Sequence, residues 1–272
     1  MTPGEAPHDT PEELIDGLLS LAERCAQAAG SLLHDERPTV LEVSAKSSPT
    51  DVVTQMDRAA EDLLSRMILT ERPDDGILGE EGAARAGTSG VRWVIDPLDG
   101  TTNYVYGLPL WCVSIAAEVD AQTAVGVVHA PALGLTYVGV AGRGSLERSR
   151  RGERPLAAST VVDLQQALLS TGFGYDSEQR RRQAEALVEV APRVRDVRRL
   201  GSAAIDLCWV AAGHTDAYVE SRLHPWDVAA GALIAREAGA IVVGDADPIL
   251  APYVMACAPG IYASLTALLD RS

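Results

Sequence analysis

One segment near the middle of the chain, Trp93 to Asn103, constrains the fold more than any other part of the sequence. Its apolar residues are typical of a buried strand, and this strand ends at Asp96. Pro97 follows and disfavours helical backbone at the residue before it, so the chain is expected to turn there. This path lets Asp96 and Asp99 converge while the carbonyl of Leu98 also points inward. The segment therefore predicts a cluster of oxygen ligands at the end of a strand.

The next residues favour an anion beside that cluster. Gly100 permits a close approach of the backbone, and Thr101 and Thr102 can begin a helix whose free N–H groups face a negatively charged ligand. Carboxylates and a carbonyl are hard oxygen ligands, which suit Mg²⁺. Together these features predict a site that brings Mg²⁺ to a phosphate ester.

Two other segments place carboxylates at the ends of predicted elements. Glu80 and Glu81 follow the apolar run from Gly76 to Gly79, and Asp227 lies at the start of a predicted helix. Each segment alone has a simpler interpretation: a solvated turn for the first, a surface pair for the two glutamates, and a helix N-cap for Asp227. The combination of all three is what indicates a shared site.

The first half of the chain is predicted to hold two helices followed by a run of strands. A capping box at Thr10 and Glu13 predicts a helix that extends to about Leu33, and a second helix begins near Thr54. Residues 35–50 between them are polar and are predicted as a loop. Strands are expected at Gly76–Gly79, Val91–Ile95, Trp111–Val119, Ala124–Ala130 and Leu135–Ala141. Short turns join the last three, so an antiparallel sheet is expected within residues 10–155.

The second half, residues 156–272, alternates strands with helices, which predicts a mixed α/β arrangement. Strands are expected at Leu168–Gly172, Val197–Leu200, Asp216–Glu220, Ala240–Val243 and Tyr253–Cys257. Helices are expected at Ser177–Val190, Ala203–Ala212, Asp227–Ala238 and from about Ile261 onward. Between the halves lies a cluster of arginines that is predicted as a solvated turn: Arg148, Arg150, Arg151 and Arg154.

Charge and composition argue against several classes of protein. The 272-residue chain has a net charge of −15, whereas a nonspecific binder of nucleic acid or anionic membranes needs an excess of Lys and Arg. Phosphate chemistry stays open because metal ions can reverse the local charge. The polar first ten residues lack the features of a signal peptide, and the four cysteines have no redox or metal-ligand spacing. We expect a cytoplasmic protein with reduced, mostly buried thiols and a flexible tail at residues 1–9.

The order and spacing of four segments resemble the inositol monophosphatase family. These segments are Asp51–Asp57, Gly79–Glu81, Trp93–Asn103 and Trp226–Gly231. They lie within a stretch from Lys46 to about Gly239, and the signatures around Asp96 and Asp227 rarely occur together by chance. Within the family, the chain is similar to bacterial SuhB-type inositol-1-phosphatases, particularly those of actinobacteria.

The resemblance implies a fold, a cofactor and a set of metal ligands. The fold would be the layered αβαβα sandwich that the family shares with fructose-1,6-bisphosphatases, here as one α/β domain over residues 1–272 and as a homodimer. The ligands of Mg²⁺ would be Glu80, Asp96, Asp99, Asp227 and the carbonyl of Leu98.

The resemblance also implies roles in catalysis and substrate binding. Thr101 and Glu80 would orient and deprotonate the attacking water, Asp57 would bond to Thr101, and Lys46 would lie near the outer phosphate or a third, weaker metal position. The residues in contact with the substrate would be Asp99, Gly100, Thr101, Gly201, Ser202, Ala203 and Glu220. Among these, the N–H groups of Gly100 and Thr101 would bind phosphate oxygens, and Glu220 would accept an inositol hydroxyl.

The implied activity is Mg²⁺-dependent hydrolysis of myo-inositol 1-phosphate, with inhibition by Li⁺. Three other small phosphates stay open as substrates: histidinol phosphate, fructose 1,6-bisphosphate and 3′-phosphoadenosine 5′-phosphate. Glu220 favours a polyol, because a carboxylate would repel a second phosphate. A SuhB-like regulatory role as a binding partner is the alternative from another functional class. The segment between Val243 and Met255 is shorter than in relatives and is expected to lie away from the site.

Overall fold

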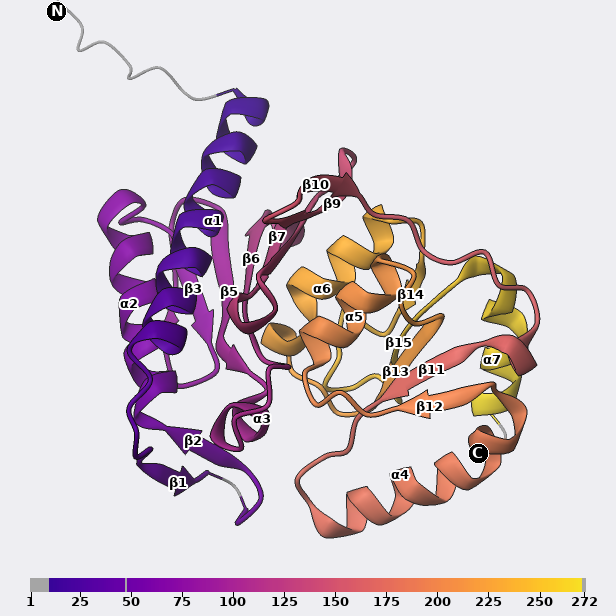
Figure 1. Cartoon of the computed structure of the whole chain (residues 1–272). Helices are drawn as coiled ribbons and strands as arrows, with labels where there is room; N and C mark the ends of the chain where they lie inside the picture. The colour runs from indigo at the N-terminus through magenta and orange to yellow at the C-terminus, as the bar shows by residue number, and fades with distance from the viewer. Residues whose placement is uncertain (1–9, 47, 271–272) are drawn as a thin grey trace, which may run out of the picture.

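The computed structural model describes residues 10–46 and 48–270, so the expected flexible tail at residues 1–9 lies outside the described part. Five layers follow one another across the molecule: a pair of helices, a large sheet, a second pair of helices, a smaller sheet and an outer pair of helices (Figure 1). The expected α/β class and αβαβα sandwich are confirmed.

The first layer consists of α1 (Pro11–Asp35) and α2 (Gln55–Glu71). α1 begins at the predicted capping box, in which the N–H of Thr10 donates to Glu13 Oε2 at 2.9 Å. α2 begins in the same way, because the N–H of Thr54 donates to Asp57 Oδ2 at 2.9 Å. The cap of α2 therefore also fixes the direction of a carboxylate that the sequence placed at the site.

The large sheet has the strand order β10-β9-β8-β7-β6-β5-β3-β4. Its strands are β3 (Gly76–Gly79), β4 (Ala84–Arg85), β5 (Val91–Asp99), β6 (Cys112–Val119), β7 (Gln122–Ala130), β8 (Leu135–Val140), β9 (Gly144–Ser149) and β10 (Gly152–Pro155). Neighbouring strands are antiparallel except β3 and β5, which are parallel, so the expectation of an antiparallel sheet is wrong for this pair. β4 pairs with the opposite edge of β3 and reverses the chain, so β5 runs in the same direction as β3.

Two segments that the sequence predicts as loop or turn are strands. The arginine-rich segment after Glu147 forms the hairpin of β9 and β10, in which Arg154 bonds to Glu147 at 2.8 Å and Arg148 to Glu153 at 2.7 Å. Charged cross-strand pairs stabilise this hairpin. Because its strands lack the alternation of apolar and polar residues, the sequence pattern did not predict them. Within residues 35–50, β1 (Val43–Ala45) pairs with β2 (Val52–Thr54).

The second half forms the remaining layers. The smaller sheet has the order β12-β11-β13-β15-β14, with β11 (Leu168–Thr171), β12 (Asp196–Arg198), β13 (Ala217–Glu220), β14 (Ile241–Val243) and β15 (Val254–Cys257). β11 is parallel to β12 and β13, whereas β15 is antiparallel to both of its neighbours. The helices are α3 (Thr101–Val105), α4 (Ser177–Val190), α5 (Ala203–Ala211), α6 (Pro225–Glu237) and α7 (Tyr262–Leu269).

Three apolar clusters hold the layers together. Trp93 and Ile95 of β5 point toward α1 and α2, whereas Val94 between them points toward α5 and α6, as the alternation of a strand requires. A third cluster joins the smaller sheet to α4 and α7. All four cysteines are buried and free, as expected. Among the described residues, no helix is both long and apolar enough to cross a membrane.

Glycines in the large sheet set the position of α6. A Cβ at Gly126 of β7 would lie 2.7 Å from the carbonyl oxygen of Ala230, and one at Gly139 of β8 would lie 3.0 Å from the Cα of Ile234. α6 therefore packs directly on the backbone of the sheet. This close contact fixes the first turn of α6, which carries Asp227.

Candidate active site

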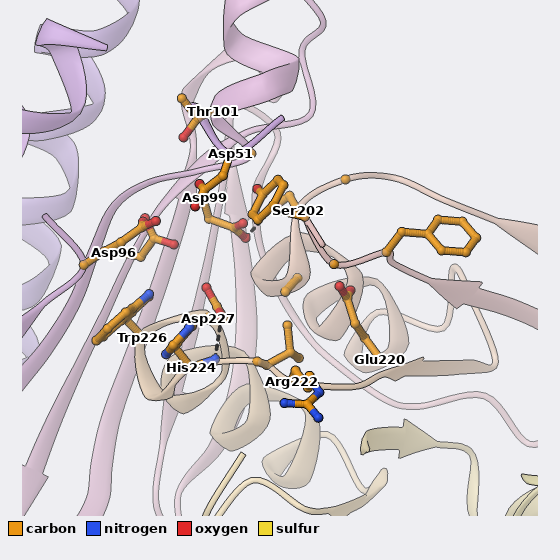
Figure 2. A pocket seen from close by; sticks show the side chains of 18 of the residues that line it. Asp51, Asp96, Asp99, Thr101, Ser202, Glu220, Arg222, His224, Trp226 and Asp227 are labelled. Atoms are coloured by element: carbon orange, nitrogen blue, oxygen red, sulfur yellow. Dashed lines mark hydrogen bonds between the residues drawn. The ribbon is translucent and has the colours of Figure 1, made fainter. Parts of the chain in front are cut away.

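A cleft of about 480 Å³ lies where the end of β5 meets the first turns of α5 and α6 (Figure 2). All the site residues predicted from the sequence line this cleft, apart from Asp57. Those that line it are Lys46, Glu80, Asp96, Leu98, Asp99, Gly100, Thr101, Gly201, Ser202, Ala203, Glu220 and Asp227. The fold thus brings together residues that lie far apart in the sequence, from Lys46 to Asp227.

Asp96 and Asp99 reach the same cleft because β5 is irregular between them. In a regular strand, residues three positions apart point to opposite faces. Here Asp96 pairs with Ser114 and Asp99 with Cys112, so three steps on β5 match two on β6. This extra residue is a β-bulge, and it re-aims the second carboxylate. The bulge lies at Pro97–Leu98, where the sequence predicts a turn, and the strand continues to Asp99.

α5 holds Asp99 in place. Ser202 caps α5, and its hydroxyl donates to Asp99 Oδ2 at 2.6 Å. The N–H of Ala204 donates to the same oxygen at 2.8 Å. A carboxylate at a helix N-terminus is stabilised in this way. The Ser202 side chain therefore acts on Asp99, and Ser202 also lines the cleft.

Asp227 occupies the third position of α6. Pro225 is the first helical residue and His224 is the N-cap. The helix therefore begins two residues before the predicted start, and the interpretation of Asp227 as the N-cap is wrong. The N–H of His224 donates to Asp227 Oδ2 at 2.6 Å. In Figure 2 the side chain points from α6 into the cleft, toward Asp99 on the other side.

Asp57 lies behind Thr101 and connects α2 to the cleft. The Thr101 hydroxyl donates to Asp57 Oδ1 at 2.9 Å, while Thr54 donates to Asp57 Oδ2 from both its N–H and its hydroxyl. Asp57 is 1% exposed, so these bonds replace solvent. Its geometry agrees with the expected contact to Thr101.

Lys46 bridges two glutamates at the edge of the cleft. Its Nζ donates to Glu80 Oε1 at 2.8 Å and also to Glu81. Burial alone would lower the pKa of Lys46, but the two carboxylates outweigh burial and raise that pKa above its ordinary range. Lys46 is the only lysine in the sequence.

The charges of the cleft are unbalanced. Burial, followed by the charges of Glu80 and Asp99, raises the pKa of Asp96 well above its ordinary value. Burial also raises the pKa of Asp99 to about 6, against the hydrogen bond from Ser202, and raises the pKa of Asp227 well above its ordinary value. Burial is the largest cause of these shifts and the neighbouring carboxylates add to it, so the ionised forms are disfavoured in the cleft.

This donor set fits a hard divalent cation. Carboxylates and the Leu98 carbonyl are oxygen donors, and a cation would relieve their repulsion. Among the residues that the structure describes, no three His, Cys, Asp or Glu side chains are gathered closely enough to hold a metal ion as they stand. The carboxylates instead line a shared space.

Comparison with known proteins agrees with this geometry. The family model described as the Inositol monophosphatase family matches residues 15–269. The chain belongs to the inositol monophosphatase family. It is therefore an enzyme of the phosphatase class, as expected.

Individual relatives show how far this likeness extends. Inositol-1-monophosphatase SuhB of Mycobacterium tuberculosis is 45% identical over 93% of each chain. The solved structure of Mycobacterium tuberculosis SuhB matches with a TM-score of 0.81 and 44% identity, over 94% of this chain and 96% of that one. The Nus factor SuhB of Escherichia coli is 40% identical over 83% of this chain and 84% of its own.

In this family member, the structure adds cleft residues to which the sequence analysis gave no role. They are Asp51, Phe173, Gly174, Tyr175, Asp176, Gln179, Arg199, Arg222, Leu223, His224, Trp226 and Ile249. Arg199 and Arg222 line the same cleft as Glu220, and the charge of Arg199 acts on the Glu220 carboxylate. The rings of His224 and Trp226 stack with centroids 4.8 Å apart. For most of these residues, the only indication in the sequence was that they lie near the segments that resemble the family.

One expectation about a loop is wrong. The segment between Val243 and Met255 reaches the cleft through Ile249 instead of lying away from it. An ion pair of Asp245 with Arg236, at 2.6 Å, ties the beginning of this segment to the last turn of α6. A sequence pattern does not contain this tertiary contact.

Proposed function

We propose that the chain hydrolyses phosphate monoesters of small polyols, myo-inositol 1-phosphate above others, with Mg²⁺ as its cofactor and water as the nucleophile. One observation carries the proposal: Glu80, Asp96, Asp99 and Asp227 line one cleft with too little positive charge to balance them. The name of the Mycobacterium tuberculosis relative, inositol-1-monophosphatase, supports the choice of substrate.

Glu80, Asp96, Asp99, Asp227 and the Leu98 carbonyl would hold the metal. When bound, Mg²⁺ would lower the pKa of a water molecule and stabilise negative charge on the phosphate and leaving oxygens. Residues of the chain would orient the water, accept its proton and bind the phosphate.

Thr101 would orient the attacking water. The Thr101 hydroxyl donates its one proton to a hydrogen bond, with Asp57 Oδ1 at 2.9 Å and the Leu98 carbonyl at 3.1 Å as its acceptors, so its lone pairs stay available to accept a hydrogen bond from water. Glu80 lines the same cleft and would take the proton that the water loses. The N–H groups of Gly100 and Thr101 would bind phosphate oxygens at the turn after β5, and Lys46 would add positive charge there.

Glu220 would recognise the polyol. It ends β13 on the side of the cleft opposite Asp96, where Figure 2 shows its carboxylate pointing inward. Burial raises its pKa to about 7, while the hydrogen bond from Tyr218 and the charge of Arg199 act in the opposite direction. A carboxylate here accepts hydroxyl hydrogen bonds and disfavours a second phosphate. Gly201, Ser202 and Ala203 would contact other hydroxyls of the ring.

A regulatory binding role is a second candidate, favoured by the name Nus factor SuhB of the Escherichia coli relative. The prediction of no nucleic-acid partner stays a prediction for this reason. A pull-down from lysate that is unchanged in an Asp96→Asn variant would support a role independent of the metal site. Inhibition by Li⁺, a homodimer and a cytoplasmic location remain part of the proposal.

A panel of substrates tests the proposed function. Phosphate release is measured in Mg²⁺ with myo-inositol 1-phosphate, histidinol phosphate, fructose 1,6-bisphosphate and 3′-phosphoadenosine 5′-phosphate. We expect the highest kcat/KM with myo-inositol 1-phosphate. A higher value for either substrate with two phosphates would contradict the role given to Glu220.

A further inference from the structure

The carboxylate of Glu220 occupies space that a glycine leaves open. β11 and β13 are parallel, and Thr171 pairs with Val219, so the residues that follow, Gly172 and Glu220, lie side by side. Laterally paired residues direct their side chains to the same face of a sheet. A Cβ at Gly172 would lie 1.8 Å from Glu220 Oε2 and 2.2 Å from its Cδ. The glutamate side chain therefore lies directly over the Cα of Gly172.

The backbone at Gly172 does not itself require glycine. Gly172 has no positive φ, whereas Gly100 and Gly201 in the same cleft have φ of 92° and 89°. At those two positions a left-handed backbone favours glycine, but at Gly172 an alanine could adopt the backbone conformation. The Glu220 carboxylate is the group that an added methyl would meet.

Tyr218 restrains the same carboxylate from a second direction. It lies two residues before Glu220 on β13 and so points to the same face. Its ring is fully buried, and its hydroxyl donates to Glu220 Oε2 at 2.7 Å. This bond uses one carboxylate oxygen and leaves the second available for a ligand.

We propose that Gly172 and Tyr218 are positioning residues that set the substrate preference of the cleft, because together they hold the Glu220 carboxylate where it can accept a hydroxyl of a polyol phosphate. The proposal rests on the proposed function in one respect, the role of Glu220. Glu220 also lines a second, mainly apolar pocket of about 170 Å³ beside Val219 and Leu187. Open space therefore lies beside the carboxylate of Glu220.

The test compares two substrates in each variant. The quantity is the ratio of kcat/KM for myo-inositol 1-phosphate to kcat/KM for p-nitrophenyl phosphate, which offers no polyol hydroxyl. Loss of one hydrogen bond to a charged group should lower this ratio by about 10- to 150-fold. We expect Gly172→Ala and Tyr218→Phe each to lower the ratio by about 10-fold or more on this basis. Gly17→Ala, in α1 with no atom within 4 Å of the added Cβ, is the matched control and should keep the wild-type ratio.

Double variants separate positioning from a general effect on the fold. In a Glu220→Ala background, Gly172→Ala should cause no further loss, because its target is absent. Glu220→Asp shortens the side chain by one methylene and should restore part of the ratio lost in Gly172→Ala. The proposal would be overturned if Gly172→Ala left the ratio unchanged. It would also be overturned if Gly172→Ala lowered the ratio as much in the Glu220→Ala background as it does in the wild type.

A crystal structure of the Gly172→Ala variant distinguishes this proposal from the proposed function. If the wild type hydrolyses neither ester, the proposed function is wrong, and the structure alone decides the positioning claim. We expect the Glu220 carboxylate to be displaced from its wild-type place. A Glu220 side chain in the wild-type position beside Ala at residue 172 would overturn the claim.

Discussion

Asp96, Asp99 and Asp227 each use one carboxylate oxygen to bond to the protein. Asp96 Oδ1 accepts the N–H of Leu98 at 2.9 Å, Asp99 Oδ2 accepts from α5, and Asp227 Oδ2 accepts the N–H of His224. These bonds restrain the three side chains, all of which line the cleft. The bonding pattern suits ligands that must be held apart until a cation joins them.

Replacing a carboxylate by its amide tests this arrangement. We expect Asp96→Asn and Asp227→Asn each to lower kcat by about 100-fold or more, because each removes a charged oxygen ligand. The melting temperature of the metal-free protein should hold or rise, since one repelling charge is gone. Normal turnover together with a much lower melting temperature would show that the two residues are structural caps.

Glu220 should affect specificity more than chemistry. We expect Glu220→Ala to lower kcat/KM for myo-inositol 1-phosphate by about 10- to 150-fold, the value of one charged hydrogen bond. The loss for p-nitrophenyl phosphate should be much smaller. Equal losses on the two esters, measured on one protein preparation, would mean that Glu220 supports the fold or the metal.

At the scale of elements, helix N-termini and strand ends build the site. α5 and α6 begin at the cleft, while β5 and β13 end there. The sequence pattern predicted the start of α5 and the end of β13, but it placed the start of α6 two residues late and ended β5 too early. The bulge in β5 was predicted only as a turn. A proline indicates that a strand is interrupted, but it does not show whether the strand ends there or continues after one extra residue. The β9–β10 hairpin was missed because charged pairs replace its apolar alternation.

Two caps of the same kind separate stability from catalysis. Thr10→Ala removes the cap of α1 and should cost about 1 kcal/mol of unfolding free energy with kcat unchanged. Asp57→Ala removes the N3 carboxylate of the α2 capping box, which accepts from the N-cap residue Thr54, and also the acceptor of the Thr101 hydroxyl. We therefore expect a loss of stability together with a kcat about 10- to 100-fold lower. Urea unfolding and kcat on both variants decide the matter, and a wild-type kcat in Asp57→Ala would contradict the role of Thr101.

At the scale of the whole molecule, the two halves meet at the cleft. β5 supplies Asp96 and Asp99, whereas the second half supplies Glu220 and Asp227. One apolar cluster contains Val94 of β5 together with side chains of α5 and β15, so we propose that the chain folds as a single domain. Local patterns and the family resemblance predicted the layers, but the strand order of the smaller sheet and the contact of Ile249 with the cleft depend on tertiary packing.

The acidic cleft should make the metal-free protein sensitive to pH. Burial raises the folded-state pKa of Asp99 to about 6 and that of Glu220 to about 7, so the folded state retains protons that the unfolded state loses. Their contribution to stability is fully present below about pH 4 and is lost as the pH rises through 6 and 7. The pKa values of Asp96 and Asp227 are raised as well, so these residues act in the same direction.

One buried group opposes this trend. Burial lowers the pKa of His129, so its contribution to stability is lost as the pH falls below about 6.5. One histidine opposes four carboxylates, and we expect the melting temperature in EDTA to fall between pH 5.5 and pH 8.5. Mg²⁺ should raise it, most strongly at pH 8.5. A melting temperature that rises with pH in EDTA, or that Mg²⁺ leaves unchanged, would contradict the assignment of the cleft.

The requirement for a cation tests the central claim most directly. Phosphate release from myo-inositol 1-phosphate is measured with the purified wild-type protein, first in excess EDTA and then after Mg²⁺ is added beyond the chelator. In this account bound Mg²⁺ lowers the pKa of the attacking water, so we predict no turnover above background in EDTA and full recovery with Mg²⁺. Full activity in excess EDTA would contradict the account.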